Sequence, residues 1–211
     1  MKRLVSALLI AGLFASATAS ANVLVNGGFD TGDFIGWTTY NSANGVSSPA
    51  VTSADVTGLG ASLAAQFMVG ERVFSRLYEG GGIRQAFSVA GGMVSISADI
   101  ASVGDNFGQN NGGGRYELFL DGILLDMVDV GTIDQGEVVR NTLSFSGLIG
   151  SGLHELNIFM SRPYTSVSET PRQYIDNVDV TLAADVPEPG TTVLFGLGLA
   201  AACVAMRRAR N

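Results

Sequence analysis

The amino-acid sequence predicts an all-β protein of the sandwich type, and three observations lead to this prediction. Apolar residues mostly alternate with polar ones, which is the period of a half-buried strand and not of a helix. Glycine-rich turn signals separate the alternating runs at short intervals, as in sandwiches and barrels. No long amphipathic helix is visible between residues 22 and 186, although the segment 62–69 fits a short one.

The alternation is clearest in the central part of the chain. From Val94 to Ile100, every second residue is apolar, and the residues between them are serine or aspartate. This pattern predicts a strand with one face in the core. Residues 115–120 form the next run, and Asp121-Gly122 after it signals a tight hairpin turn, from which the chain returns through residues 123–130.

Three further alternating runs complete the predicted sheets, at residues 139–145, 156–160 and 174–182. The glycine clusters between the runs do not follow a strand and open a helix, so they do not indicate a phosphate-binding loop. We interpret them as turns and loops. These clusters lie at residues 80–82, 91–92, 112–114 and 150–152.

The central part of the chain is strongly acidic. The chain has 12 Lys and Arg and 19 Asp and Glu; residues 1–21 and 187–211 hold five of the basic residues and one acid, which leaves a net charge of −11 between them. Such a domain lacks the basic patch that nucleic-acid binding needs. The only cysteine is Cys203, near the C-terminus, and the only histidine is His154. Neither a disulfide nor a Cys/His zinc site is therefore predicted within the domain.

The first 21 residues have the three parts of a secretory signal peptide. Lys2 and Arg3 give a positive start, residues 4–14 are apolar, and Ala19-Ser20-Ala21 fits a cleavage site for signal peptidase. A transmembrane helix is the alternative, but the apolar stretch is short and is followed by small residues rather than a charged flank. The sequence therefore predicts export, with Asn22 as the first residue of the mature protein.

The last 25 residues also show three parts in a fixed order: a proline-containing triplet, an apolar run and a basic end. These parts are Pro187, Glu188 and Pro189, then residues 191–206, then Arg207, Arg208 and Arg210. Sixteen apolar or small residues suffice for a marginal membrane-spanning helix, and the arginines would hold its end on the cytoplasmic side.

This tail resembles the PEP-CTERM sorting signal of Gram-negative bacteria. The resemblance covers only about the last 25 residues, but the order of triplet, apolar run and arginine cluster is specific. It implies transient anchoring in the inner membrane, recognition by an exosortase-type transpeptidase, and cleavage near the triplet. The domain would then reach the cell surface or the extracellular matrix, where such proteins are linked to exopolysaccharide and biofilm. A plain C-terminal membrane anchor is the alternative.

The two ends of the acidic domain resemble galactose-binding-like jelly rolls, the fold of many carbohydrate-binding modules. The stretch NGGFDTGDFIGW at 26–37 is similar to the opening of that fold, and YIDNV at 174–178 to its closing strand. The resemblance implies a jelly-roll β-sandwich over residues 22–186, flanked by the signal helix and the apolar C-terminal helix. It also implies that Trp37 packs in the core behind the first loop.

A structural calcium ion is the one cofactor that the sequence suggests. Strict alternation would place Asp176 on an inward face with Tyr174 and Val178, where a lone carboxylate is costly. In the resembled fold, a calcium ion is often held between the first and last strands, and Asp30 and Asp176 match its acidic positions. Calcium accepts carboxylate and carbonyl oxygens as ligands. The alternative is that Asp176 accepts backbone N–H groups while Asp30 is solvated.

Aromatic residues near loops are the candidate contacts to a glycan, because aromatic rings stack on sugar rings. Tyr40, Tyr78 and Tyr164 have such positions, and Arg84 would add hydrogen bonds. No catalytic residue is predicted. The predicted function is non-catalytic binding of an extracellular polysaccharide. A structural surface or biofilm-matrix protein without a small ligand is the first alternative, and a secreted polysaccharide hydrolase is the second.

Overall fold

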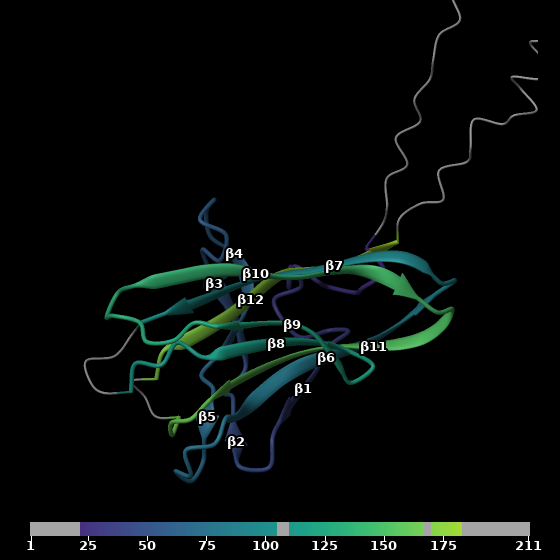
Figure 1. Ribbon diagram of the computed structural model, residues 1–211. Coiled ribbons are helices and arrows are strands. Elements are labelled where there is room, and N and C mark those ends of the chain that lie inside the picture. Colours follow the sequence, from purple (N-terminus) through teal and green to yellow (C-terminus); the bar gives the residue numbers. More distant parts are fainter. Residues whose placement is uncertain (1–21, 105–109, 167–169, 183–211) are drawn as a thin grey trace, which may run out of the picture. The chain divides into compact units, whose positions relative to one another are not determined.

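Two antiparallel five-stranded sheets lie face to face in the computed structural model, which describes residues 22–104, 110–166 and 170–182 (Figure 1). The strands are β1 (Thr38–Asn41), β2 (Gly45–Val46), β3 (Ala50–Ala54), β4 (Ser62–Phe67), β5 (Gly70–Glu71), β6 (Glu79–Val89), β7 (Gly92–Val103), β8 (Arg115–Leu120), β9 (Ile123–Asp129), β10 (Val138–Ile149), β11 (Gly152–Arg162) and β12 (Arg172–Leu182). One sheet has the order β1-β6-β11-β8-β9 and the other β10-β7-β12-β4-β3. A small sheet pairs β2 with β5.

The main core lies between the two five-stranded sheets and follows the alternation in the sequence. In β7, the predicted inner row from Val94 to Ile100 is buried, while Ser95 on the other face is exposed. Trp37 is also in the core, at 7% exposure, and its indole N–H donates to the Asn26 carbonyl at 3.0 Å. Each buried aliphatic side chain contributes about 1.5–3 kcal/mol, so these facing rows supply most of the stabilisation.

The predicted hairpin at residues 121–122 is confirmed. Asp121 and Gly122 join β8 to β9 with φ angles of 51° and 77°. Two positive φ angles are typical of a type I′ turn, whose twist matches that of the flanking strands. An aspartate followed by a glycine adopts this conformation at low cost, which explains why the local sequence sufficed for the prediction.

Two local expectations are wrong. The segment 62–69 is no helix, because β4 pairs with β3 on one side and β12 on the other, and this pairing overrides the local propensity. Gly80, Gly81 and Gly82 form no turn but lie inside β6. At Gly82, a Cβ atom would lie 2.2 Å from the Ile158 carbonyl oxygen, so the close approach of β11 requires glycine there.

A β-bulge in β12 changes which residues of this strand face the core. Strict alternation would put Tyr174, Asp176 and Val178 on one face, and that expectation is wrong. Between Asp176 and Asp179 the register with β7 shifts, with Asn177 at a φ of 48°. Val178 therefore faces the main core, whereas Tyr174 packs in a separate small cluster with Val56, Ala64 and Ala101.

The first and last described segments lie side by side, as the resemblance implied. The Val23 N–H donates to the Val180 carbonyl at 3.0 Å, and the Val178 N–H donates to the Gly27 carbonyl at 2.9 Å. The described chain therefore begins and ends at the same end of the sandwich (Figure 1). The predicted signal helix and the PEP-CTERM tail lie outside the described residues. No helix in the described ranges is long and apolar enough to cross a membrane.

Candidate functional site

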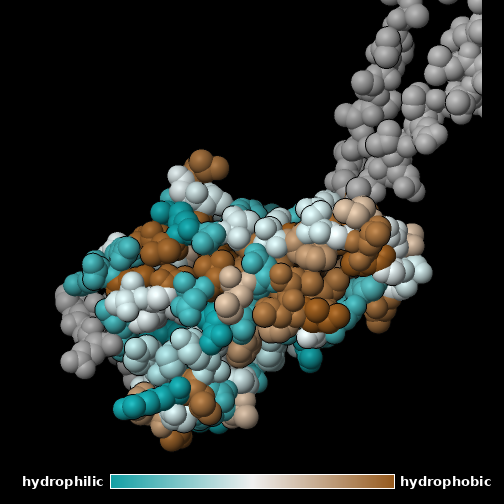
Figure 2. Space-filling view, viewed as in Figure 1, coloured by the Kyte–Doolittle hydropathy of each residue, from teal (hydrophilic) through white to brown (hydrophobic). Residues whose placement is uncertain are grey.

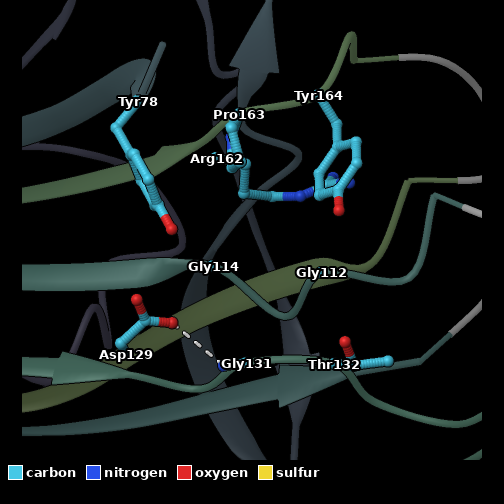
Figure 3. A pocket seen from close by; sticks show the side chains of 9 residues that line it. All are labelled: Tyr78, Gly112, Gly114, Asp129, Gly131, Thr132, Arg162, Pro163 and Tyr164. Atoms are coloured by element: carbon cyan, nitrogen blue, oxygen red, sulfur yellow. Dashed lines mark hydrogen bonds between the residues drawn. The ribbon is translucent and has the colours of Figure 1, made fainter. Parts of the chain in front are cut away.

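A pocket of about 160 Å³ lies where β8 begins and where β9 and β11 end (Figure 3). Four segments that are far apart in sequence meet there, because β8 pairs with both β9 and β11, and β11 also pairs with β6, which Tyr78 precedes. The residues that line the pocket are Tyr78, Gly112, Gly114, Asp129, Gly131, Thr132, Arg162, Pro163 and Tyr164. Two of the four predicted ligand residues, Tyr78 and Tyr164, are among them.

The two tyrosines lie on opposite sides of the pocket, with Arg162 and Pro163 between them (Figure 3). Their exposed fractions are 45% for Tyr78 and 37% for Tyr164. The guanidinium carbon of Arg115 lies 3.8 Å from the Tyr78 ring centroid, so one face of that ring is covered by a cation. Part of each tyrosine side chain is nevertheless exposed and open to a ligand.

The Tyr164 ring is held against the backbone at Gly112. A Cβ atom at that position would lie 2.9 Å from Cε2 of the ring, which is closer than real contacts allow. The guanidinium carbon of Arg162 lies 5.6 Å from the ring centroid. The Tyr164 ring can therefore occupy its observed position only because residue 112 has no side chain.

Arg162, the last residue of β11, is fully buried. Its side chain donates to the Val69 carbonyl at 3.2 Å and to both oxygens of Asn110, the backbone one at 3.3 Å. Burial lowers the pKa of Arg162 to about 10, and the nearby Tyr164 acts in the opposite direction. Its Nε atom has no hydrogen-bond partner among the residues that the structure describes.

Asp129 provides the acceptor at the opposite wall of the pocket. One of its carboxylate oxygens accepts the Gly131 N–H at 3.0 Å, which fixes the side chain at the end of β9 (Figure 3). Thr132 adds a hydroxyl group nearby. The pocket thus combines two aromatic rings with a cation, a carboxylate and a hydroxyl, the mixture of apolar walls and a few placed polar groups that small-ligand sites have.

The other two predicted ligand residues, Tyr40 and Arg84, lie together elsewhere on the same sheet and do not line the pocket. The Tyr40 hydroxyl donates to Asn157 Oδ1 at 2.7 Å, and its ring stacks on Phe159 with the centroids 6.1 Å apart. Burial raises the pKa of Tyr40. The Arg84 guanidinium lies 5.7 Å from the Tyr40 ring and 3.8 Å from the Glu155 carboxylate. The structure therefore divides the four predicted residues into two pairs.

Asp176 is buried at 1% exposure, while Asp30 is exposed on the opening loop. The two oxygens of Asp176 accept hydrogen bonds from Ser62 Oγ at 2.6 Å and from the Asn177 N–H at 2.7 Å. Burial raises the pKa of Asp176, and the negative charges of Asp99 and Asp30 raise it further. No group of three or more His, Cys, Asp or Glu side chains in the described ranges is placed to hold a metal ion. A calcium ion at Asp30 and Asp176 stays a prediction, and it would need backbone carbonyls as further ligands.

Sequence reasoning missed the buried role of Arg162 and the placement of Asp129, Thr132 and Gly112. Asp129 and Thr132 follow β9, while Gly112 precedes β8. Their spacing in the chain gives no sign that they meet, since only the pairing of β8 with its two neighbours brings them together. The one available signal was that polar and glycine residues gather where strands end.

The PEP-CTERM protein-sorting motif matches residues 185–210, so the chain carries this motif, as its sequence indicated. A search of the curated proteins finds no match. Among solved structures, the module TmCBM61 in complex with β-1,4-galactotriose is similar, with a TM-score of 0.50 and 16% identity over 78% of this chain and all of the module. This likeness confirms the jelly-roll β-sandwich.

Two further solved structures have lower scores and carry no separate argument. The enzymatically active domain of the bacteriophage CBA120 tailspike protein 4 has a TM-score of 0.48 and 15% identity, over 77% of this chain and 21% of its own. The CBM22-1–GH10 modules of Clostridium thermocellum xylanase 10B have a TM-score of 0.46 and 14% identity, over 78% of this chain and 29% of their own.

Proposed function

We propose that this chain is an exported, non-catalytic glycan-binding protein that acts at the cell surface or in the extracellular matrix. The observation that carries the proposal is the pocket in which Tyr78 and Tyr164 flank Arg162, with Asp129 on the opposite wall (Figure 3). The similarity of the fold to a module described in complex with β-1,4-galactotriose supports this proposal.

The chemistry of the pocket suits a sugar ring. Aromatic faces pack on the C–H faces of a sugar, while charged side chains bind its hydroxyl groups. At about 160 Å³, the pocket is smaller than the roughly 300–1,000 Å³ of sites for drug-sized ligands. We therefore infer that it holds one sugar residue of a longer glycan.

Binding without catalysis is favoured by the carboxylates of the pocket. Most glycosidases use a pair of Asp or Glu side chains on the two sides of the scissile bond. Of the described residues that line the pocket, Asp129 is the one carboxylate. Its hydrogen bond to the Gly131 N–H suits an acceptor that is fixed in place.

The route to the surface follows from the sorting motif at residues 185–210. We infer that signal peptidase removes residues 1–21, that residues 191–206 anchor the chain transiently in the inner membrane, and that an exosortase-type enzyme cleaves near Pro187. The ligand that the protein then meets is the polysaccharide around the cell.

A glycan array, followed by calorimetric titration of the best binder and of the host exopolysaccharide, tests the function. Tyr78→Ala and Tyr164→Ala should each weaken binding by at least about tenfold, since removing an aromatic hot spot costs about 2 kcal/mol or more. Phe74→Ala is the matched control, because Phe74 is an aromatic residue with 55% exposure outside the pocket.

Three results would contradict the proposal. If the protein binds no glycan but is found in the matrix, it is a structural surface protein. If it binds a glycan equally well after both tyrosine changes, the pocket is not the site. Turnover of the bound polysaccharide would show that the protein is a hydrolase.

A further inference from the structure

The end of the sandwich opposite the pocket is free of charge over two long hairpins. β11 runs from Gly152 at this end to Arg162 at the pocket, and eleven residues of strand span about 35 Å. We call the end with Gly152 the terminal end, since the described chain also starts and stops there. It is the right-hand end in Figure 1.

The hairpin between β6 and β7 carries no charged residue from Gln85 to Ala98, and neither does the hairpin between β10 and β11 from Asn141 to Leu153. The domain as a whole has 18 acidic residues and 7 arginines. If these hairpins contacted only water, we would expect them to carry charged residues as the rest of the domain does.

Large apolar side chains are exposed at the terminal end. Leu148 is 77% exposed, Leu153 74%, Ile123 67% and Met93 44%. The register brings Met93 opposite Leu148, and Asp121, in the turn before Ile123, binds His154, the neighbour of Leu153. Figure 2 shows a continuous hydrophobic area at this end of the molecule. Apolar surface gathered in this way marks a contact with a partner or a membrane.

The chain leaves the domain at this same end. Leu182, the last residue of β12, pairs with Val94, which is next to Met93. Eight residues, 183–190, separate Leu182 from the apolar run that starts at Thr191. Even fully extended, eight residues span at most about 29 Å. Any membrane that receives residues 191–206 therefore lies within about 29 Å of Leu182 at the terminal end.

We propose that the terminal end rests on a lipid bilayer while the tail is inserted, with Leu148, Leu153, Ile123 and Met93 entering the interface. This inference rests on the proposed insertion of residues 191–206 and does not depend on glycan binding. A second copy of the chain is a poorer occupant, because two domains with a net charge of −11 repel each other. In this orientation the pocket points away from the bilayer, towards the polysaccharide.

Depth-dependent fluorescence quenching tests the contact on the full chain in phosphatidylcholine vesicles. In a Cys203→Ala background, an environment-sensitive dye is attached at Leu148→Cys or at Leu153→Cys. The control site is Leu59→Cys, since Leu59 is 93% exposed but lies on the β3–β4 loop. This loop is far from the terminal end. Its Gly58 lies beside Arg140, and Arg140 pairs with Ala101, which is nine residues along β7 from Gly92 at the terminal end.

Lipids with a nitroxide at the headgroup should quench the dyes at 148 and 153 several-fold more strongly than the dye at 59. Equal and weak quenching at all three sites would overturn the proposal. Self-quenching of the dyes that disappears on dilution with unlabelled protein would also overturn it, because the surface would then bind a second copy.

A charge placed on the surface gives a second, independent readout. Leu153→Asp should lower the quenching of a dye at residue 148, since a carboxylate at the interface must stay hydrated. Leu59→Asp, the same change at a leucine that is even more exposed, should leave that quenching unchanged. A thermal melt of each variant shows that the fold is retained, and unchanged quenching in a folded Leu153→Asp protein would contradict the proposal.

Discussion

At the scale of single residues, Arg162 shows how the fold places a buried hydrogen-bond donor at the proposed site. A buried guanidinium loses the solvation of its charge, and here its partners are carbonyl and amide oxygens rather than a carboxylate. Its Nε atom is left without a partner among the described residues, beside Tyr164 and Gly112. A ligand hydroxyl that accepts a hydrogen bond at this site would recover part of the solvation that the arginine has lost.

The position of the Tyr164 ring should depend on the residue at 112. In Gly112→Ala, the new Cβ atom would meet the ring at 2.9 Å, so the ring must move out of the pocket wall. We expect glycan affinity to fall by about tenfold, or about 1.4 kcal/mol, with little change in melting temperature. Calorimetric titration and a thermal melt measure the two effects. Unchanged affinity would mean that Tyr164 is not a ligand contact.

Asp176 should make stability depend on pH in the absence of calcium. Because burial raises its pKa above the ordinary 3.8, the folded state holds the proton more tightly, and stability falls as pH rises through this region. At pH 7 in a chelator, Asp176→Asn should therefore melt at least as high as the unchanged protein. Below pH 3.8 the variant should no longer melt at a higher temperature than the unchanged protein, because Asp176 is then protonated in both the folded and the unfolded state. Asp134→Asn, a change at an exposed carboxylate, is the control.

If calcium binds at Asp30 and Asp176, its addition should make the unchanged protein melt at a higher temperature than Asp176→Asn. Adding calcium should raise the melting temperature of the unchanged protein, because a ligand that binds only the folded state stabilises it. Neither Asp176→Asn nor Asp30→Asn should respond. If calcium leaves the unchanged protein unaffected, Asp176 has no role beyond accepting its two hydrogen bonds from Ser62 and Asn177.

At the scale of the elements, His154 ties two hairpins together. Its Nδ1 atom lies 2.7 Å from the Asp121 carboxylate in the β8–β9 turn, and its Nε2 atom lies 3.0 Å from the Gly150 carbonyl in the β10–β11 turn. The bond to Asp121 is the main cause that raises the pKa of His154, and the Gly150 carbonyl adds to it. Strand pairing thus brings the only histidine of the chain to an acid that is distant in sequence.

The two hairpins should be held together best in mildly acidic solution. A raised histidine pKa contributes stability that is fully present below the ordinary 6.5 and is lost as pH rises through the folded value. The pKa of Asp121 is lowered, first by the Glu155 N–H and then by His154, so its contribution is lost as pH falls below the ordinary 3.8.

The change His154→Gln tests this dependence. The loss of melting temperature on this change should be larger at pH 5 than at pH 8, as measured by thermal melts across that range. Asp121→Asn should show the same trend, because it removes the partner that raises the histidine pKa. A loss that does not vary with pH would mean that the histidine contributes by packing on Phe87, whose ring centroid is 5.8 Å away.

At the scale of the whole molecule, the two surfaces for which we propose functions lie at opposite ends of the sandwich. The pocket is where β9 and β11 end, and the chain enters and leaves at the other end. A protein that is tethered at one end and binds at the other can reach a polysaccharide without turning. The strands fix this arrangement, because β11 and the long strands beside it run from one end of the sandwich to the other.

The sorting motif should decide where the protein is found. In its native host, the intact mass should correspond to a chain that starts at Asn22 and ends near Val186, recovered outside the cell. Deleting residues 187–211 should abolish retention at the membrane stage and release the domain early. Mass spectrometry of the membrane and outer fractions measures both. A full tail retained in the membrane would make residues 191–206 a plain anchor.

The sequence by itself determined the fold class, the strands from β7 to β12 and the sorting motif. Alternation such as that of Val94 to Ile100 is a local property, and so is the turn at Asp121 and Gly122. The order of triplet, apolar run and arginines is equally local. These features could be predicted because period, turn chemistry and motif order depend on neighbours in the chain.

Only the tertiary structure decided which of these residues act together. The bulge at Asn177 turned Asp176 away from the main core, and strand pairing at 62–67 replaced the expected helix. Pairing of β6 with β11 joined Tyr78 and Tyr164 in one pocket, whereas Tyr40 lies outside it. Contacts between distant segments depend on the register of whole strands, and no short stretch of sequence contains that information.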